Sequence, residues 1–346
     1  MKVTIIWINH NSRHSIEKVF ESLYCVVKQK FSDYELVIVD DGSTDGSDKM
    51  IRNFIKEEKL YNEIPELKIV KLSKSYGFTG AVNAGYRVRS NNSKYVVVHN
   101  NDACMYKDTL DDYVKVMEEN EDIGALQGII LWAYDKHIVD SAGGYLVLRL
   151  PSSFLDIIHI RGIKIDVLQS LISRYSDSIG IPITFFEGTL PIIRIESVRK
   201  ILGSYGEQSL FITSARFYYL EDVLLSLLLW NTGFRVYLYN KPVGHHYRGI
   251  VLQTIGRSRE FEKIIKRNYF VLRTLIVHGL FSRYYSLLLD LIYVLRSFVR
   301  SLKRKSVDEL CSIANGIKLY IETRKALHLR KLSMKNVPLL LQLATK

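Results

Sequence analysis

Four strand-forming residues lead directly into a polar cluster in the segment Tyr95-Val96-Val97-Val98-His99-Asn100-Asn101-Asp102. A continuous apolar run of this kind is typical of a strand buried on both faces, as in a parallel sheet covered by helices. Open α/β sheets bind their ligands at the carboxyl ends of such strands. Asn100, Asn101 and Asp102 therefore offer oxygen ligands for a hard divalent cation such as Mg²⁺ or Mn²⁺, although Asn-Asn-Asp also ends strands as an ordinary turn.

The same order of strand, polar segment and helix occurs three times earlier in the chain. We expect strands at residues 3–8, 35–39 and 67–72, and the apolar spacing between residues 15 and 28 predicts a helix after the first of them. Strand and helix thus alternate four times within about a hundred residues. This alternation predicts an α/β fold with a mostly parallel, doubly wound sheet.

Polar or small residues follow each of the four strands. The carboxyl ends of parallel strands share one edge of the sheet, so we expect these segments to converge. Carboxylates at that edge can accept hydrogen bonds from a ribose or a base, and glycines let a ligand approach the backbone closely. Each segment taken alone is also explained as a loop of turn and cap residues. The segments contain Asn9 and Asn11, Asp40 and Asp41, Gly77, Gly80 and Asn83, and Asn100 to Asp102.

Two common phosphate-binding motifs are missing from the sequence. No Gly-x-Gly-x-x-Gly follows the first strand, and no Gly-x-x-x-x-Gly-Lys-Ser/Thr occurs in the chain. The pyrophosphate turn of a dehydrogenase and a P-loop are therefore both excluded. A nucleotide diphosphate bound at this edge would need a metal at Asp102 to neutralise it.

Length, hydropathy and cysteine content indicate a folded protein of a reducing compartment. The 346 residues, with a mean hydropathy of +0.02, can form one large domain with an appendage or two domains. Cys25, Cys104 and Cys311 are widely spaced and odd in number, which indicates neither a disulfide framework nor a cysteine-rich zinc site. We therefore expect a cytoplasmic protein. The apolar run near Met1 is too short for a signal peptide and fits the first strand.

The middle of the chain is less regular. We expect a helix at residues 109–119, a strand at 123–131 and a turn at 140–144, and we assign no structure to residues 145–183. Residues 184–194 resemble a strand in which Gly188, next to Glu187, would let a bound group approach closely.

Two further clusters follow that strand. Glu221 and Asp222 precede an apolar helix, where two carboxylates can either complement the helix dipole or supply a general base in a partly desolvated cleft. A short strand at residues 235–239 leads into an expected loop at 241–249 that carries His245 and His246. This pair is either an exposed turn or the source of one neutral imidazole that completes a metal shell begun by Asp102.

Taken in order, these motifs resemble those of the inverting nucleotide-sugar glycosyltransferases of family 2, which have the GT-A fold. The resemblance covers about residues 2–250, and its nearest branch is rhamnosyltransferase-like, where Asn-Asn-Asp often replaces Asp-x-Asp. Any one motif is weak, but the ordered set is strong. It consists of Ile8-Asn9-His10-Asn11, Val39-Asp40-Asp41-Gly42-Ser43-Thr44-Asp45-Gly46-Ser47, Gly77-Phe78-Thr79-Gly80-Ala81-Val82-Asn83-Ala84-Gly85, Asn100-Asn101-Asp102, Glu187-Gly188, Glu221-Asp222 and the histidine pair.

The resemblance implies a role for each motif. Four groups follow from it: nucleotide-binding residues, residues near the donor or acceptor sugar, metal ligands and a catalytic base. They are, in that order, Asn9, Asn11, Asp40, Asp41, Gly77, Gly80 and Asn83; Asn100, Asn101, Glu187 and Gly188; Asp102 with Asn100 and either His246 or His245; and Asp222 or Glu221. Two positions depart from the family pattern, because Asn100 is neutral and Leu224 stands where relatives often carry a second acid.

The implied reaction is a single displacement at the anomeric carbon. A sugar would move with inversion from a UDP-, GDP- or dTDP-sugar to a hydroxyl of a glycan or lipid-linked acceptor. Asp222 would take the acceptor proton, and Mg²⁺ or Mn²⁺ would stabilise the leaving nucleoside diphosphate. The alternative interpretation is a nucleotidyltransferase or another nucleotide-binding enzyme on a similar sheet.

The carboxy-terminal region, residues 251–346, is expected to be a helical, basic unit that follows a catalytic domain at residues 1–250. Residues 250–305 contain twelve Lys or Arg but three Asp or Glu. Their apolar runs are too short to span a membrane. Amphipathic helices with cationic margins fit attachment to an anionic membrane surface, here the inner face of the cell membrane, where a lipid-linked acceptor would be presented.

This basic region has two other interpretations. A helical appendage could pack on the catalytic domain or on another subunit of a homo-oligomer. Nucleic-acid binding explains the charge but not the four strand-end clusters, and the sequence contains no recognised nucleic-acid motif, so we expect no nucleic-acid partner.

Overall fold

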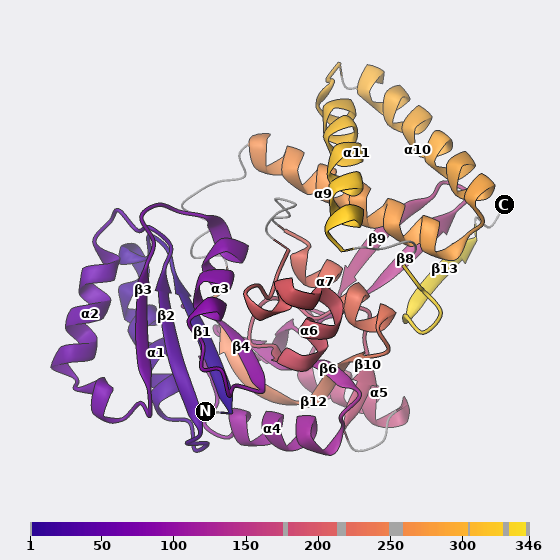
Figure 1. The fold of residues 1–346 in the computed structure, drawn as a ribbon. Helices are drawn as coiled ribbons and strands as arrows, with labels where there is room; N and C mark the ends of the chain where they lie inside the picture. The colour runs from indigo at the N-terminus through magenta and orange to yellow at the C-terminus, as the bar shows by residue number, and fades with distance from the viewer. Residues whose placement is uncertain are drawn as a thin grey trace.

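The computed structural model describes residues 2–175, 179–212, 219–248, 259–303, 305–327 and 332–343. Its centre is a mixed sheet with helices on both faces, and a group of three long helices lies to one side of this α/β unit (Figure 1). The sheet order is β10-β12-β6-β11-β4-β1-β2-β3, with β5 added beside β12 and β7 beside β6.

The first half of the chain forms the predicted parallel sheet. Strands β1 to β4 pair in parallel in the order β4-β1-β2-β3. Helices α1 to α4 follow these strands and the short β5. The bounds are β1 Val3–Asn9, α1 Ile16–Val27, β2 Tyr34–Asp40, α2 Ser47–Glu57, β3 Leu67–Lys71, α3 Gly77–Arg87, β4 Tyr95–Asn100, β5 Ala103–Met105 and α4 Thr109–Glu119.

Both faces of this sheet are buried, as the uninterrupted apolar strands predicted. Successive side chains of a strand point to opposite faces. In β4, Tyr95 and Val97 belong to the core formed with α1, α2 and α4, whereas Val96 and Val98 belong to the core formed with α3, α6 and α7. Burying an aliphatic side chain of this size stabilises the fold by about 1.5–3 kcal/mol.

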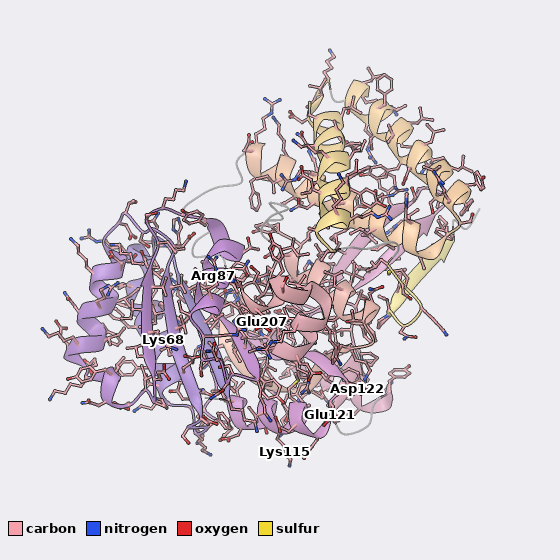
Figure 2. The ribbon with its side chains drawn as sticks, viewed as in Figure 1. Lys68, Arg87, Lys115, Glu121, Asp122 and Glu207 are labelled. Carbon is pink, nitrogen blue, oxygen red and sulfur yellow. A yellow bond between two sulfur atoms is a disulfide. The ribbon has the colours of Figure 1, made fainter. Side chains whose placement is uncertain are left out.

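A buried carboxylate in the second strand is neutralised by its neighbour. Glu35 has no exposed surface, and its Oε2 lies 2.6 Å from Lys68 Nζ. Lys68, labelled in Figure 2, belongs to the adjacent strand β3. Burial opposes ionisation of Glu35, but the hydrogen bonds from Lys68, Ser90 and Thr4 outweigh it and lower the pKa of the carboxyl. Glu35, the charged residue in this apolar strand, therefore has a structural role.

The second half extends the sheet with antiparallel neighbours and helices. β11 is antiparallel to both β4 and β6, while β12 is parallel to β6. The bounds are β6 Ile123–Trp132, β7 Asp135–Ser141, α5 Ile165–Tyr175, β10 Gly180–Pro182, β11 Ile192–Arg194, α6 Ile195–Leu202, α7 Glu221–Asn231 and β12 Arg235–His246, with short 3₁₀ helices at Arg13–Ser15, Leu60–Asn62 and Gly203–Glu207.

Three local expectations about this half were wrong. The expected strand at 184–194 is confined to β11, because the segment before Ile192 bends at Gly188, Thr189 and Leu190 instead of pairing along its length. The expected turn at 140–144 is divided between β7 and the next strand. The expected histidine loop at 241–249 is largely strand, since β12 continues to His246 by means of irregularities around Pro242 that accommodate a residue without an N–H.

Residues left unassigned in the sequence form part of a second sheet. β8 (Gly144–Leu150) pairs with β9 (Phe154–His159) and with β13 (Leu339–Leu343) near the carboxyl end. The helices α9 (Arg259–Leu280), α10 (Arg283–Lys303) and α11 (Asp308–Ala326) pack beside this sheet (Figure 1). Among the described residues, no helix has both the length and the apolar content needed to cross a membrane.

A buried arginine joins these helices to the β8–β9 connection. Arg273 of α9 has no exposed surface and pairs with Asp290 of α10. It also donates to the Ser153 carbonyl at 3.0 Å and to the Ser153 hydroxyl at 2.7 Å. The buried guanidinium of Arg273 therefore has a carboxylate partner for its charge and oxygen acceptors for its N–H groups, as a buried charge requires.

The structure also corrects the expectation from the cysteines. Cys25 of α1 and Cys104 of β5 form a disulfide with a Cα–Cα distance of 5.3 Å, and Cys311 is free and exposed. The two half-cystines are 79 residues apart in sequence. Their proximity arises only when α1 packs across β5, so spacing alone did not indicate it.

Candidate active site

Three strand ends meet in a hydrogen-bonded cluster at the carboxyl edge of the sheet. Asn9 at the end of β1 donates to Asp40 Oδ1 at 2.8 Å, and its own side-chain oxygen accepts from Asn101 Nδ2 at 2.9 Å. All three side chains are buried. The structure therefore brings together the polar segments that follow β1, β2 and β4.

Asp41 and Asn11 order the loops of the same edge. The Asp41 carboxylate accepts hydrogen bonds from Ser75 Oγ at 2.6 Å and from the backbone N–H groups of Tyr76 and Gly77 at 2.7 and 3.0 Å, at the start of α3. Asn11 Oδ1 accepts from the Thr44 N–H at 2.8 Å. These contacts fix the shape of the predicted nucleotide pocket.

The glycine-spaced segment is held by close packing. Gly77 has a φ of +73°, which a residue with a side chain adopts only with strain, and a Cβ on Gly80 would lie 2.5 Å from Tyr76 Cβ. Asn83 is fully buried and bonds to the backbone of residues 210–211, at 2.7 Å to the Phe211 carbonyl and 2.9 Å from its N–H. Asn83 therefore positions a neighbouring segment.

Asp102 and His246 form a buried carboxylate–imidazole pair. His246 Nε2 lies 2.9 Å from Asp102 Oδ1, and its Nδ1 lies 2.9 Å from Asp140 Oδ2. Burial opposes protonation of His246, but the charge of Asp102 and the hydrogen bonds to Asp102 and Asp140 raise the pKa of the imidazole to about 9. The pocket thus favours a positive charge.

This donor set fits the predicted divalent cation. Asp102 and His246 can provide an oxygen and a nitrogen ligand, while Asp140 orients the imidazole through its other nitrogen, as outer-shell carboxylates do. Asn100 is close by and donates from its amide nitrogen to Thr189 Oγ1 at 2.9 Å, which leaves its carbonyl oxygen as the candidate ligand.

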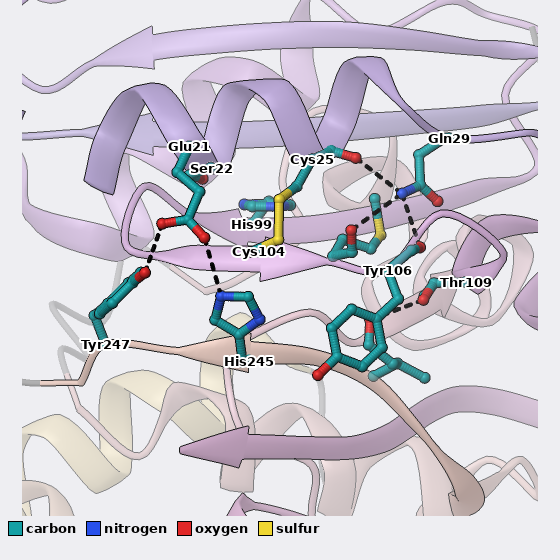
Figure 3. The surroundings of a disulfide bond; sticks show 12 residues. Glu21, Ser22, Cys25, Gln29, His99, Cys104, Tyr106, Thr109, His245 and Tyr247 are labelled. Carbon is teal, nitrogen blue, oxygen red and sulfur yellow. Dashed lines mark hydrogen bonds and ion pairs between the residues drawn. A yellow bond between two sulfur atoms is a disulfide. The ribbon is translucent and has the colours of Figure 1, made fainter. Parts of the chain in front are cut away.

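His245 belongs to a different environment. Because the pair lies in a strand, the two rings point to opposite sides. His245 Nε2 lies 3.3 Å from Glu21 Oε1 of α1, and Tyr247 donates to the other oxygen of the same carboxylate at 2.5 Å (Figure 3). Of the two candidate histidines, His246 is the one that the structure places against Asp102.

An arginine links this centre to Glu187. Arg248 donates from Nε to Asp140 Oδ1 at 2.6 Å and from Nη2 to Glu187 Oε2 at 3.2 Å. Glu187 also pairs with His159 of β9 and with Ser141 of β7. Burial opposes ionisation of Glu187, but the His159 contact and the Ser141 and Arg248 neighbours together lower the pKa of the carboxyl.

Glu221 and Asp222 form the first turn of α7, rather than preceding it. Burial raises the pKa of both carboxyls, and the neighbouring charges add to the effect, Asp222 acting on Glu221 and Glu187 on Asp222. Asp222 is the better stabilised anion, since the N–H of Val223 donates to its Oδ1 at 2.8 Å and His159 lies close enough to lower its pKa. Leu224, the departure from the family pattern, is buried in the core.

Several loops at this edge of the sheet contain residues with strained backbone conformations. Asn11, Leu190, Tyr219 and Leu220 have φ values between +44° and +69°, which cost non-glycine residues about 1–3 kcal/mol each. Tyr219 and Leu220 directly precede Glu221, and Leu190 follows the Glu187-Gly188-Thr189 segment. Strain of this kind persists where the surrounding structure fixes a functional geometry.

Four residues of the site were missing from the sequence interpretation: Ser141, Asp140, His159 and Arg248. Asp140 and Ser141 lay in the expected turn, and His159 lay in the unassigned segment. Arg248 lies two residues after His246, and a cation so close to a predicted metal ligand was the one available signal. Their roles depend on β7, β9 and β12 converging, which no local pattern indicates.

A mostly parallel sheet whose carboxyl edge carries these carboxylates, extended by antiparallel strands, defines the GT-A fold. Residues 4–165 match the model of the family described as Glycosyl transferase family 2.

Two characterised relatives align over short regions. The undecaprenyl-phosphate 4-deoxy-4-formamido-L-arabinose transferase of Proteus mirabilis is 33% identical over 85 residues, which are 25% of this chain and 24% of that protein. The dolichyl-phosphate beta-glucosyltransferase of Dictyostelium discoideum is 32% identical over 115 residues, 32% of this chain and 31% of that protein. The chain thus spans about a quarter to a third of the length of these relatives.

A solved structure shares the fold over more of the chain. The mannosyltransferase PcManGT from Pyrobaculum calidifontis, in complex with GDP-Man and Mn²⁺, has a TM-score of 0.51 at 17% identity, and the match covers 94% of this chain and 75% of that one. At this identity the likeness concerns the fold.

Proposed function

We propose that this protein transfers a sugar, with inversion, from a nucleotide-diphosphate sugar to a hydroxyl of a glycan or lipid-linked acceptor. The main support is the presence of two distinct acidic centres on one edge of a GT-A sheet. One is the Asp102–His246–Asp140 centre, and the other is the carboxylate of Asp222. Arg248, Glu187 and His159 connect them.

Each centre has a separate task in this proposal. Asn9, Asp40 and Asp41 shape the pocket for the nucleotide, and Asp102, Asn100 and His246 hold Mg²⁺ or Mn²⁺ at the diphosphate. The cation supplies charge stabilisation for the leaving nucleoside diphosphate. Glu187 and Gly188 line the sugar site. Asp222 accepts the proton of the attacking hydroxyl, a role that suits a carboxylate whose pKa burial has raised.

The relatives support the two substrate classes. The names of the two aligned relatives specify undecaprenyl phosphate and dolichyl phosphate, and the mannosyltransferase of similar fold was solved with GDP-Man and Mn²⁺. We therefore favour a polyprenyl-linked acceptor and a metal-dependent nucleotide-sugar donor.

The proposal predicts that one nucleotide sugar will stabilise the protein in a metal-dependent way. In a thermal-shift screen of UDP-, GDP- and dTDP-sugars, we expect the matching donor to raise the melting temperature with Mn²⁺ and to raise it less without the ion. A ligand at 100 times its Kd stabilises a protein by about 2.7 kcal/mol, a readily measured effect.

The same preparation separates the proposal from its alternative. A glycosyltransferase will slowly release nucleoside diphosphate from the matching donor. A nucleotidyltransferase will instead turn over a nucleoside triphosphate and form pyrophosphate, and that result would contradict the proposal.

Membrane attachment is the second part of the proposal, and helix α10 provides the surface. Its outward face carries a stripe of large apolar side chains that are between 47% and 86% exposed. They recur every three or four residues, with adjacent pairs at 287–288 and 298–299, as expected for one helix face. Together they form the α10 stripe: Tyr284, Leu287, Leu288, Leu291, Leu295, Phe298, Val299 and Leu302.

The exposed cations of α10 indicate which kind of membrane surface this helix would bind. Arg283, Arg296 and Lys303 are exposed on α10, and the opposite face is buried through Leu289 and Tyr293. An apolar stripe bordered by cations fits an anionic bilayer, into which such a helix inserts parallel to the surface. We therefore propose that the α10 stripe docks on an anionic lipid surface, where a polyprenyl-linked acceptor would be available.

Flotation with vesicles containing anionic phospholipid tests this surface. We expect the full chain to float at low salt and the variant Leu291→Glu/Leu295→Glu to float at least about tenfold less, since each buried leucine contributes about 1.5–3 kcal/mol. The matched control is Val167→Glu/Leu171→Glu, which likewise places two glutamates at comparably exposed apolar residues, here of α5, and should float normally. A full chain that stays in the soluble fraction would contradict membrane docking, and loss of self-association in the α10 variant would indicate a second copy as the occupant.

A further inference from the structure

The disulfide lies inside a second cluster of metal-binding side chains (Figure 3). Glu21 and Cys25 are one turn apart on α1, and Cys104 faces His245 directly across the β5–β12 pairing. Ligand atoms of Glu21, Cys104 and His245 all lie within 4.8 Å of one another. Because Cys25 is bonded to Cys104, four side chains with metal-binding atoms meet at one point.

His245 is a buried ring that faces this cluster. The residue is 4% exposed, and its Nε2 lies 3.3 Å from Glu21 Oε1. The ring cannot serve the Asp102 centre, because His246, its neighbour in the strand, occupies the side that faces Asp102.

We propose that, when the disulfide is reduced, Cys25, Cys104, His245 and Glu21 bind one Zn²⁺ ion. Two thiolates, an imidazole and a carboxylate make a four-ligand set of the kind that tetrahedral zinc prefers. The 3.3 Å separation of His245 Nε2 and Glu21 Oε1 also matches two ligands about 2.0–2.1 Å from one tetrahedral ion.

The redox step balances with an external dithiol as the reductant. The dithiol gives two electrons and two protons to the Cys25–Cys104 bond, which breaks to two thiols, while the reductant becomes a disulfide. Zinc binding then displaces the thiol protons into solvent. The oxidised and the zinc-bound forms are therefore alternative cross-links of the same residues.

The surroundings permit access to the sulfur atoms. A groove of about 590 Å³, lined by Phe20, Tyr24, Phe54 and both half-cystines, opens beside the bond. In either form the cross-link ties α1 to β5, and zinc would add β12 through His245. Since Asp102 directly precedes β5 and His246 ends β12, the proposed site would hold the two backbone segments that carry the Asp102 centre.

Cobalt spectroscopy of the full chain tests this proposal. Co²⁺ bound to thiolates gives an intense sulfur-to-metal charge-transfer absorption, and the Asp102 centre, which has no sulfur ligand, cannot produce it. In a Cys311→Ser background, we expect reduced protein to show two titratable thiols and this absorption at one Co²⁺ per chain. One equivalent of Zn²⁺ should abolish the absorption, and oxidised protein should not show it.

Single variants then identify the ligands. Cys25→Ser and Cys104→Ser should each lose the absorption. His245→Gln should retain both thiols but bind Zn²⁺ more weakly. Because loss of an outer-shell partner costs roughly 10- to 100-fold in affinity, we expect the loss of this direct ligand to cost more than that. Should a cysteine variant fail to fold, the comparison of reduced and oxidised parent protein still decides the question. Folded, reduced protein with two free thiols and no absorption would overturn the proposal, as would a bond that cannot be reduced without unfolding.

Discussion

Replacement of Asp222 by asparagine will leave donor binding intact and lower the rate of sugar transfer by about two to four orders of magnitude, the usual cost of losing a general base. The amide has nearly the same shape as the carboxylate and can still accept from the Val223 N–H, which lies 2.8 Å from Asp222 Oδ1. It cannot take a proton from the acceptor hydroxyl. Single-turnover transfer and donor affinity, measured on the same preparation, separate the two effects.

Glu221→Gln is the matched control for this prediction. Burial and the adjacent Asp222 raise the pKa of Glu221, and its Oε2 has no partner among the described residues, so we expect this carboxyl to remain protonated when Asp222 ionises. The variant should therefore transfer sugar at a rate much closer to that of the parent. Near-normal turnover by folded Asp222→Asn, or a larger loss in Glu221→Gln, would remove Asp222 from the role of base.

The pH dependence of the parent enzyme provides a second readout. The base must be ionised to accept a proton, and burial and Glu187 raise the pKa of Asp222. The value of kcat/KM should therefore fall as pH decreases, with a midpoint above the ordinary range of an aspartate. Because Glu221 and Asp222 interact, this midpoint belongs to the pair.

The first half of the fold follows from local sequence, and the second half does not. Strands such as β4 are marked by continuous apolar runs, and α1 by its helical spacing, because each is buried by elements close to it in the chain. By contrast, β8 pairs with β13 almost two hundred residues later, between Leu146 and Leu339 at their first paired position. A pairing partner at that distance leaves no local periodic signal.

The residues of the candidate site also fall into two groups, those that local sequence indicates and those that it does not. Asp102 and His246 could be proposed because each stands next to an apolar strand in an ordered motif. The 2.9 Å distance between Asp102 Oδ1 and His246 Nε2, and the choice of His246 over His245, depend on the last residues of β12. The sequence predicted a loop for those residues. Asp140 and His159 carry no motif at all, since their roles come only from the neighbours that the folded sheet gives them.

Replacement of Asp102 by alanine will remove the metal-dependent part of donor binding. Among the described residues, Asp102 is the carboxylate that contacts His246 Nε2, at 2.9 Å, and its removal leaves the ring with its contact to Asp140. Loss of an outer-shell partner already costs about 10- to 100-fold in metal affinity, so loss of this ligand should cost at least about 100-fold. Calorimetric titration of the matching nucleotide sugar, with and without Mn²⁺, measures the effect.

Asp140→Asn serves as the graded control for the Asp102 prediction. It keeps the three proposed ligands and weakens the hydrogen bond that orients His246, together with the ion pair to Arg248, so we expect an intermediate loss, within the 10- to 100-fold range. Because both variants remove a buried charge next to an imidazole, circular dichroism and melting curves must show that each remains folded. If folded Asp102→Ala bound the donor as tightly as the parent in Mn²⁺, the cation would have to be held elsewhere, and Asp102 would instead be a structural partner of His246. A loss in Asp140→Asn equal to that in Asp102→Ala would mean that both carboxylates are ligands, with His246 displaced from the ion.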